Sequence, residues 1–278
     1  ILVVLLVIGA PIGVAIGMSS AVSMICMIPA DVSFATSAQR IFAGSNSFSL
    51  IAIPFFILAG NIMNNGGIAT RLVNCAKVIS GRMPGALAQS NVVANMLFGA
   101  ISGSGAAAAA AMGGTIGPLE EKEGYDKNYS TAVNVASAPV GMLIPPSNTM
   151  IVYSSVAGSV SIAALFMAGY IPGILWGLAC MIVIYVYAKK RGYTSSKRYA
   201  LKEKTKIILE ALPCLLMIII VIGGIIGGIF TATEGAIVAV VYSLILSLVF
   251  YKSIKVSELP KLLMDSAEMT GIIIFLIG

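Results

Sequence analysis

The sequence contains no histidine among its 278 residues, and only 10% of its residues are charged. The lack of histidine excludes a serine–histidine dyad and most zinc sites, so Ser104 has no evident base to activate it. The chain also lacks the Walker-type phosphate loop that would support ATP hydrolysis. Its four cysteines lie far apart, without metal-ligand spacing or a disulfide framework: Cys26, Cys75, Cys180 and Cys214. These absences indicate that the chain is not an enzyme.

Apolar residues are abundant instead. Hydrophobic residues make up 58% of the chain and its mean hydropathy is +0.99. Apolar runs recur along the whole length, which predicts an all-α, polytopic membrane protein embedded in a lipid bilayer. Eight of the seventeen basic residues lie between Lys189 and Lys206. Such a cluster is typical of a cytoplasmic loop, so the net charge of +6 does not indicate a nucleic-acid partner.

The basic loop gives a fixed side from which membrane crossings can be counted. We expect crossings at residues 12–28, 50–65, 127–157, 160–188, 207–229 and 233–251, with a truncated helix at 1–9. The crossing at 127–157 is interrupted at Pro145 and Pro146. Residues 67–83 place basic residues among apolar ones, which suits an amphipathic helix on the inner membrane surface.

Residues 85–119 predict a re-entrant hairpin. They are rich in glycine and alanine and contain the sequence Ser-Gly-Ser-Gly at 102–105. Charged residues flank both ends, which suggests that both ends lie on one aqueous side. Each arm has about 16 residues, or roughly 24 Å at 1.5 Å per residue, which is short of a full crossing. We therefore expect the segment to enter, turn at the glycines and leave on the same side.

A pattern of short helix, helix, polar arm and Ile-Phe-Leu-rich helix occurs twice. The first arm, 31–47, is expected outside and the second, 255–268, inside, which makes an inverted-topology repeat of the kind found in secondary transporters. The expected parts are four: scaffold helices at 1–84, a transport-domain hairpin and broken helix at 85–157, a helix and basic loop at 158–206, and the start of a second repeat at 207–278. Because both ends fall in apolar runs, we expect a fragment of a longer subunit.

The two breaks, at 102–105 and 144–149, predict one shared binding site. Two prolines leave the carbonyls of residues 140–143 without partners, and Ser147, Asn148 and Thr149 then open a half-helix whose positive end favours an anion. We expect the hairpin tip to contact the break. The alternatives are close helix packing through small residues at the tip and a simple kink at the prolines.

Glu234, the one acid at the head of an apolar span, has two interpretations. It can cap the helix together with Thr231 or Thr233, which is the favoured interpretation, or it can take part in ion coupling.

Four motifs carry a family resemblance. In chain order they are Ser-Gly-Ser-Gly-Ala at 102–106, Gly-Tyr-Asp at 124–126, Ile-Pro-Pro-Ser at 144–147 and Thr-Glu-Gly-Ala at 233–236. Together they resemble the large membrane subunit of TRAP transporters, the tripartite ATP-independent periplasmic carriers. The resemblance implies an elevator-type transporter of the bacterial inner membrane, driven by Na⁺. It also implies a small membrane subunit and a periplasmic substrate-binding protein as partners.

The resemblance also implies roles for single residues. Those implied to hold sodium are Ser102, Gly103, Ser104, Gly141, Leu143 and Pro145, and those implied to bind substrate are Ser104, Ser147, Asn148 and Thr149. Family substrates are mostly small organic anions: C4-dicarboxylates, sugar acids and sialic acid. Asn148 after Pro-Pro-Ser favours the sugar-acid members, and no organic cofactor is expected.

Two other functions remain open from the sequence. One is a sodium/dicarboxylate symporter of related architecture that works without a binding protein. The other is a passive ion channel or a structural membrane subunit, in which the breaks only line a pore or kink a helix.

Overall fold

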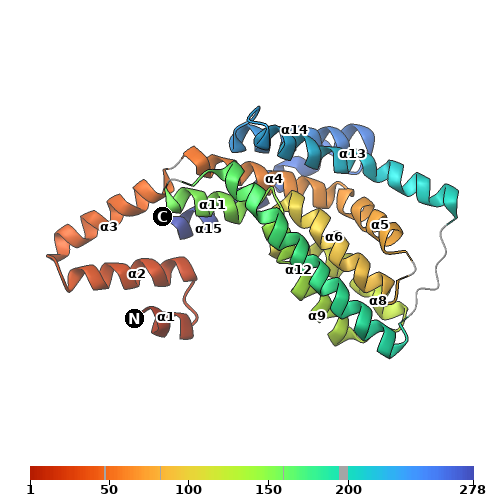
Figure 1. The fold of residues 1–278 in the computed structure, drawn as a ribbon. Helices are drawn as coiled ribbons and strands as arrows, with labels where there is room; N and C mark the ends of the chain where they lie inside the picture. Colours follow the sequence, from red (N-terminus) through yellow and green to blue (C-terminus); the bar gives the residue numbers. More distant parts are fainter. Residues whose placement is uncertain (47, 82, 159, 194–199) are drawn as a thin grey trace.

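The protein is all-helical over the part of the chain that the structure, a computed structural model, describes: residues 1–46, 48–81, 83–158, 160–193 and 200–278. Figure 1 shows a body of packed helices from which the first three helices project as a separate arm. The helices, in chain order, are α1 (Leu2–Val7), α2 (Ile12–Ile25), α3 (Ala30–Ser45), η1 (Phe48–Ile51), α4 (Ala52–Asn65), α5 (Ile68–Ser80), α6 (Ala86–Ser102), α7 (Gly105–Thr115), α8 (Gly117–Lys122), α9 (Lys127–Ser137), α10 (Val140–Leu143), α11 (Asn148–Ala157), α12 (Ile162–Arg191), α13 (Leu201–Ile226), α14 (Ala232–Ile245), η2 (Leu246–Phe250), η3 (Val256–Glu258) and α15 (Leu259–Ile277). The expected all-α fold is confirmed.

Three of the described helices are long and apolar enough to cross a membrane: α12, α13 and α14 continued by η2. A fourth crossing is possible where α9 and α10 are followed by α11 after a bend of 51°. These positions match the expected crossings at 160–188, 207–229 and 233–251 and the interrupted one at 127–157. Helix α4, at the expected crossing 50–65, is shorter and forms the centre of the core, where it packs against α14, α15 and α6.

The hairpin expected at 85–119 is confirmed as a helical hairpin. Helix α6 ends at Gly103, whose φ of +61° is the left-handed cap that glycine adopts readily, and α7 starts two residues later. Both ends of the hairpin meet at Tyr193, because the Gly85 N–H donates to the Tyr193 carbonyl over 2.9 Å and the ring of Tyr125 stacks on that of Tyr193 at 4.4 Å. The second arm is shorter than expected, since α7 has 11 residues before α8 begins.

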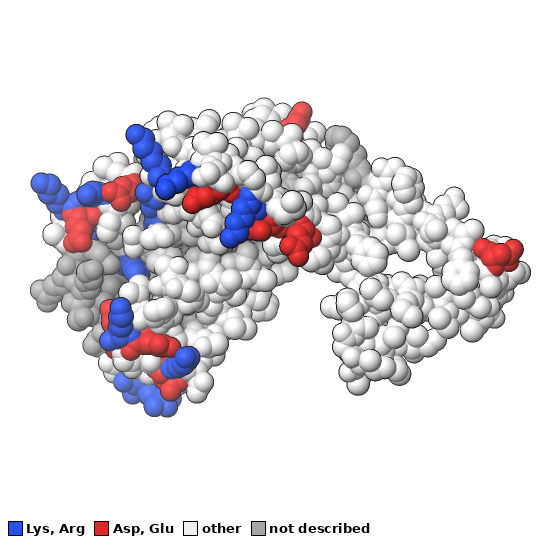
Figure 2. Space-filling model, turned by 180° about the vertical axis from the view of Figure 1, so that it is seen from behind, with Lys and Arg blue, Asp and Glu red and all other residues white. Residues whose placement is uncertain are grey.

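Charged side chains lie at the hairpin base, at the start of α13, and along η3 and the first half of α15. Figure 2 shows most of the lysine, arginine, aspartate and glutamate on one half of the visible face, whereas the projecting arm is almost free of charge. Residues Arg82, Lys197 and Arg198, which belong to the basic clusters noted in the sequence, lie outside the described residues. The hairpin base and the end of the long helix α12 therefore share one polar region, as the sequence predicted, and its cytoplasmic location stays a prediction.

Two local expectations are corrected by the structure. The first polar arm, 31–47, is helix α3 over its described residues, and the second arm runs without a break into the Ile-Phe-Leu run as the single helix α15. Continuity of α15 follows from its sequence, which has Pro260 in the first turn and no glycine until Gly271. Helix α5 is amphipathic, as expected, and its apolar face packs on α6 and α13. Its place at the inner membrane surface stays a prediction. The inverted relation of the two repeats stays a prediction.

The capping interpretation of Glu234 is confirmed. Its carboxylate accepts from the Thr231 backbone N–H over 2.8 Å, and the Thr231 hydroxyl oxygen accepts from the Glu234 N–H over 3.3 Å. This reciprocal pair satisfies two donors at the start of α14.

Buried amides hold the hairpin to α9. The Asn95 amide nitrogen on α6 donates to the Asn134 side-chain oxygen over 3.2 Å and to the Ser137 hydroxyl over 2.8 Å. The Asn134 amide nitrogen in turn donates to the Ala109 carbonyl on α7 over 2.8 Å. Because all three side chains are buried, these bonds fix the relative positions of α6, α7 and α9.

Helix α6 crosses α10 at a contact between two glycines. A methyl group added to Gly99 would lie 2.3 Å from the Gly141 Cα, and the reverse distance is the same. Since both neighbours are backbone, neither can move aside without displacing a helix. This contact brings the hairpin against the broken helix one turn below the tip.

We expect Gly99→Ala to lower the melting temperature of the detergent-solubilised protein, with a cost of about 1–3 kcal/mol from overpacking. Gly114→Ala, on the neighbouring arm α7, is the matched control, because a methyl group there meets nothing within 4 Å. The control is expected to be neutral or to stabilise by up to about 1 kcal/mol through helix propensity. Equal melting temperatures of the two variants would contradict the close crossing.

Candidate functional site

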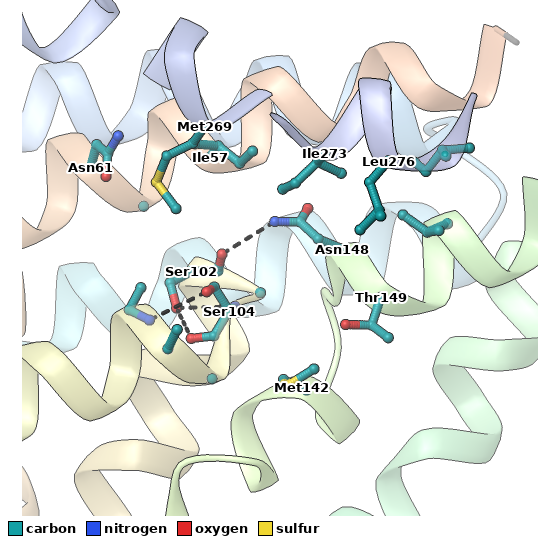
Figure 3. Close-up of a pocket in the computed structure, with 17 residues that line it drawn as sticks. Ile57, Asn61, Ser102, Ser104, Met142, Asn148, Thr149, Met269, Ile273 and Leu276 are labelled. Carbon is teal, nitrogen blue, oxygen red and sulfur yellow. Dashed lines mark hydrogen bonds between the residues drawn. The ribbon is translucent and has the colours of Figure 1, made fainter. Parts of the chain in front are cut away.

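A cavity of about 390 Å³ lies at the hairpin tip (Figure 3). Five parts of the chain surround it: the tip itself, α10 through Met142, the start of α11, one face of α4 and the C-terminal half of α15. The lining residues are Ile57, Gly60, Asn61, Ser102, Gly103, Ser104, Gly105, Ala106, Ala107, Met142, Asn148, Thr149, Val152, Met269, Ile273, Leu276 and Ile277. None of them carries a formal charge, so any ion bound here would be held by dipoles.

The hairpin tip and the break in the crossing helix meet at this cavity, as the sequence predicted. The Asn148 amide nitrogen donates to the Ser102 carbonyl over 3.5 Å. Gly103 lies so close that a methyl group built on it would be 2.9 Å from the Asn148 backbone nitrogen. Met142, just before the prolines, lines the same cavity. The two interruptions of regular helix thus share one location, although 46 residues separate Ser102 from Asn148.

The two serines of the tip shape its backbone. The Ser104 N–H donates to the Ser102 hydroxyl oxygen over 3.4 Å, and the Ser104 hydroxyl oxygen accepts from the Ala107 N–H over 3.3 Å. Ser104 is therefore the N-cap of α7. A hydroxyl oxygen has two lone pairs, so this capping bond leaves Ser104 able to accept or ligate a second partner.

Three helix ends converge on the cavity. The C-terminal end of α6 at Ser102 presents carbonyl groups, while the N-terminal ends of α7 and α11 present N–H groups. Ser147, the N-cap of α11, makes no side-chain capping bond, so the first N–H groups of that helix remain available. Because helix C-termini favour cations and N-termini favour anions, the arrangement can hold a cation beside an anion.

Asn148 contributes a further acceptor. Its side-chain oxygen is buried and has no hydrogen-bond partner among the described residues. An unpaired buried acceptor costs free energy, so this oxygen favours the presence of a ligand or a water molecule.

Four of the residues implied as site residues lie away from the cavity wall. Gly141 packs on Gly99, and a methyl group on Gly169 of α12 would overlap the Leu143 carbonyl oxygen. The Ser147 hydroxyl donates to the Met142 carbonyl over 2.5 Å, which satisfies one of the carbonyls that the prolines release. Pro145 is buried beside them. Their roles in sodium or substrate binding stay predictions; Ser102, Gly103, Ser104, Asn148 and Thr149 do line the cavity.

The sequence did not point to the opposite wall of the cavity. Asn61 on α4 donates through its amide nitrogen to the Ser266 hydroxyl of α15 over 2.8 Å, and apolar side chains such as Met269 and Ile273 complete this wall. Asn61 stands alone in the apolar run 51–63, and polar side chains in such runs usually face the interior of a helix bundle. This pattern could have indicated that Asn61 faces a site. The residues of α15 gave no signal, since they read as an ordinary apolar helix.

The arrangement is suited to binding rather than to bond chemistry. The lining holds serine and threonine hydroxyls and amides but no base that could activate them. Among the described residues, no group of three or more acidic, histidine or cysteine side chains could hold a metal ion. A small polar or anionic molecule, with hard oxygen ligands nearby for a monovalent cation, fits these features.

Comparisons with known proteins point to a family of membrane transporters. The model of the family described as "Tripartite ATP-independent periplasmic transporter, DctM component" matches residues 1–278. Over 275 residues, 99% of this chain, the sequence is 52% identical to the uncharacterized protein YgiK of Salmonella typhimurium, of which it covers 63%. It is 39% identical to the C4-dicarboxylate TRAP transporter large permease protein DctM of Pseudomonas aeruginosa, over 95% of this chain and 61% of that protein.

A third relative is named for a different substrate. The sialic acid TRAP transporter large permease protein SiaM of Vibrio cholerae is 36% identical over 98% of this chain and 63% of its own length. The chain thus spans a little over three fifths of the length of these three relatives, 61% to 63%.

Gly103→Ala tests the contact between the tip and Asn148. We expect it to lower the melting temperature of the solubilised protein more than Gly158→Ala, by about 1–3 kcal/mol of extra overpacking cost. Both glycines have positive φ, +61° and +76°, so both variants suffer backbone strain, but a methyl group on Gly158 meets nothing within 4 Å. If both variants lose the same stability, the loss comes from the left-handed backbone alone. That result would contradict close packing at the hairpin tip.

Proposed function

Because the chain belongs to the DctM-component family of the tripartite ATP-independent periplasmic transporters, we propose that it takes up a small organic anion by sodium-coupled transport across the bacterial inner membrane. The family is one of multi-pass membrane transporters and not of enzymes. In the proposed function a periplasmic binding protein delivers the substrate and a small membrane subunit assists. The chain spans little more than three fifths of the length of these relatives, so the activity of a complete permease is itself part of the proposal.

The convergence of three helix ends at the tip cavity carries this proposal. The N-terminal ends of α7 and α11 supply N–H groups for a carboxylate, and the C-terminal end of α6 supplies carbonyl oxygen for a cation. Broken helices with this polarity are how secondary transporters bind charged substrates without burying charged side chains. A cavity of about 390 Å³ is within the size range for small-molecule sites.

The substrate class follows from the same features. The two characterised relatives described above are named for C4-dicarboxylates and for sialic acid, and both substrates carry a carboxylate. Asn148 and Thr149 at the head of α11 are placed to bind the polar groups of such an anion. The asparagine favours a sugar acid such as sialic acid, because its amide both donates to and accepts from hydroxyl groups.

Sodium is proposed as the coupling ion at the tip. The oxygens of Ser102 and Ser104 are neutral, and a cation among neutral ligands leaves a local positive charge that favours an anion beside it. Occupancy of the two sites is then coupled reciprocally, typically by about 1–3 kcal/mol. Movement of the hairpin and broken helix against the other helices would complete an elevator mechanism.

Two competing functions differ in measurable ways. A passive channel conducts without substrate dependence or sodium coupling. A symporter that works alone takes up its substrate without a binding protein, so uptake into proteoliposomes with and without the soluble protein separates it from the proposed function.

Ser104→Ala is expected to raise the sodium concentration for half-maximal uptake about tenfold, as loss of one ligand worth about 1.4 kcal/mol predicts. Asn148→Ala is expected to raise mainly the substrate KM. Uptake into proteoliposomes that contain the full-length permease, measured against both concentrations, checks both expectations.

Ser161→Ala is the matched control for Ser104→Ala. Ser161 caps α12 through an equivalent bond from the Ala164 N–H over 3.4 Å, and it lies outside the tip cavity. Loss of a cap alone costs about 1 kcal/mol of stability in both variants. If both substitutions change the sodium dependence of uptake equally, Ser104 has only a structural role.

The topology is tested by labelling a single cysteine at Glu121→Cys in a variant whose four native cysteines are replaced. We expect labelling only after the inner face of the membrane is made accessible, because Glu121 lies at the hairpin base beside the end of α12. Labelling by an impermeant reagent in intact, sealed cells would contradict both the orientation and the re-entrant hairpin.

A further inference from the structure

A second cavity, of about 260 Å³, lies at the base of the hairpin and shares no lining residue with the tip cavity. It is formed where α6, α8 and α9 meet, and its polar wall includes Asn91, Glu120, Ser130 and Asn134. Glu120 is completely buried, which is uncommon for a carboxyl group. Nothing in the proposed transport mechanism uses this residue.

Glu120 has a hydroxyl partner but no opposite charge. The Ser130 hydroxyl bonds one carboxyl oxygen, while the other oxygen has no hydrogen-bond partner among the described residues. Lys127, the basic residue on the cavity wall, instead pairs with Glu121, its Nζ atom 3.6 Å from a carboxylate oxygen, and its side chain is 81% exposed. Burial, followed by the nearby charge of Glu123, raises the pKa of Glu120 to about 8. An ionised Glu120 therefore needs a neutralising partner that the side chains around it do not supply.

A second buried group also faces this cavity without a partner. Asn91 is buried, and its side-chain oxygen accepts from the Asn95 amide over 3.0 Å, but its amide nitrogen has no partner among the described residues. A water molecule in the cavity would accept a hydrogen bond from this amide. The cavity thus offers a carboxylate oxygen, a hydroxyl oxygen and a position for bound water.

We propose that Glu120, Ser130 and the water held by Asn91 form a binding site for a monovalent alkali metal ion at the hairpin base. Glu121 also lines the cavity, but it is half exposed and its charge is paired with that of Lys127, so Glu120 is the unpaired carboxylate. A single carboxylate balances a single positive charge, whereas divalent ions in proteins usually take several carboxylates. Carboxylate, hydroxyl and water oxygens are the hard ligands that alkali ions prefer. The bound ion would tie α8 to α9 and, through water, to α6, so it would stabilise the base of the hairpin while the tip binds its own ligands.

Binding of radioactive sodium to the purified full-length permease tests this site. The experiment uses a Ser104→Ala background, in which the proposed tip site is weakened, so that failure of one site is distinguishable from failure of the other. We expect Glu120→Gln in this background to bind one sodium ion fewer per chain at saturation. Glu123→Gln is the matched control, because this nearby carboxylate is exposed and does not line the cavity; it is expected to leave the number unchanged.

A second variant keeps the test decisive if Glu120→Gln fails to fold. Ser130→Ala retains the carboxylate but removes one oxygen ligand, and it is expected to raise the sodium Kd of the base site about tenfold. Unlabelled potassium is added as a competitor to show whether the site prefers sodium or accepts either ion. An unchanged number of bound ions in Glu120→Gln, with an unchanged Kd in Ser130→Ala, would overturn the proposal and show that Glu120 is simply protonated.

Discussion

The contact between Gly103 and Asn148 joins the two interruptions of regular helix in this protein. Two segments interrupt regular helix within an apolar protein, and each leaves backbone polar groups without intrahelical partners. In a bilayer such groups are tolerated only where protein, water or a ligand satisfies them. Bringing the interruptions together lets Asn148 bond the Ser102 carbonyl and leaves the remaining groups facing one cavity.

Much of the surrounding packing maintains that contact. The glycine pair at Gly99 and Gly141 lets α6 lie against the broken helix, and the Asn95–Asn134 amides lock the hairpin arms to α9. At the base of the hairpin, Tyr193 contacts both ends beside the end of α12: its carbonyl accepts from the Gly85 N–H and its ring stacks on that of Tyr125. The hairpin is therefore fixed at its base, middle and tip. This arrangement gives a physical reason for treating the hairpin and the broken helix as one unit in the proposed transport cycle.

The sequence predicted the features that depend on local chemistry. Glycine and proline mark the breaks at Gly103 and Pro145, and the length of the apolar runs marks the long helices. It missed features that depend on tertiary contacts: the helical state of α3, the wall of the cavity formed by α15, and the burial of Glu120. Glu120 stands among three other charged residues at 121–123, and such a run usually lies in water. Only the packing of α8 on α9 reveals that one of these carboxyl groups points inward.

We propose that the hairpin tip and the broken helix together form the site for the transported anion and its sodium ion. An experimental structure of the full-length permease, determined in sodium with the transported anion bound, would locate both ligands. We expect density for the anion beside Asn148 and Thr149, and density for an ion beside Ser102 and Ser104. An anion bound elsewhere, with this cavity empty under saturating substrate, would contradict the account.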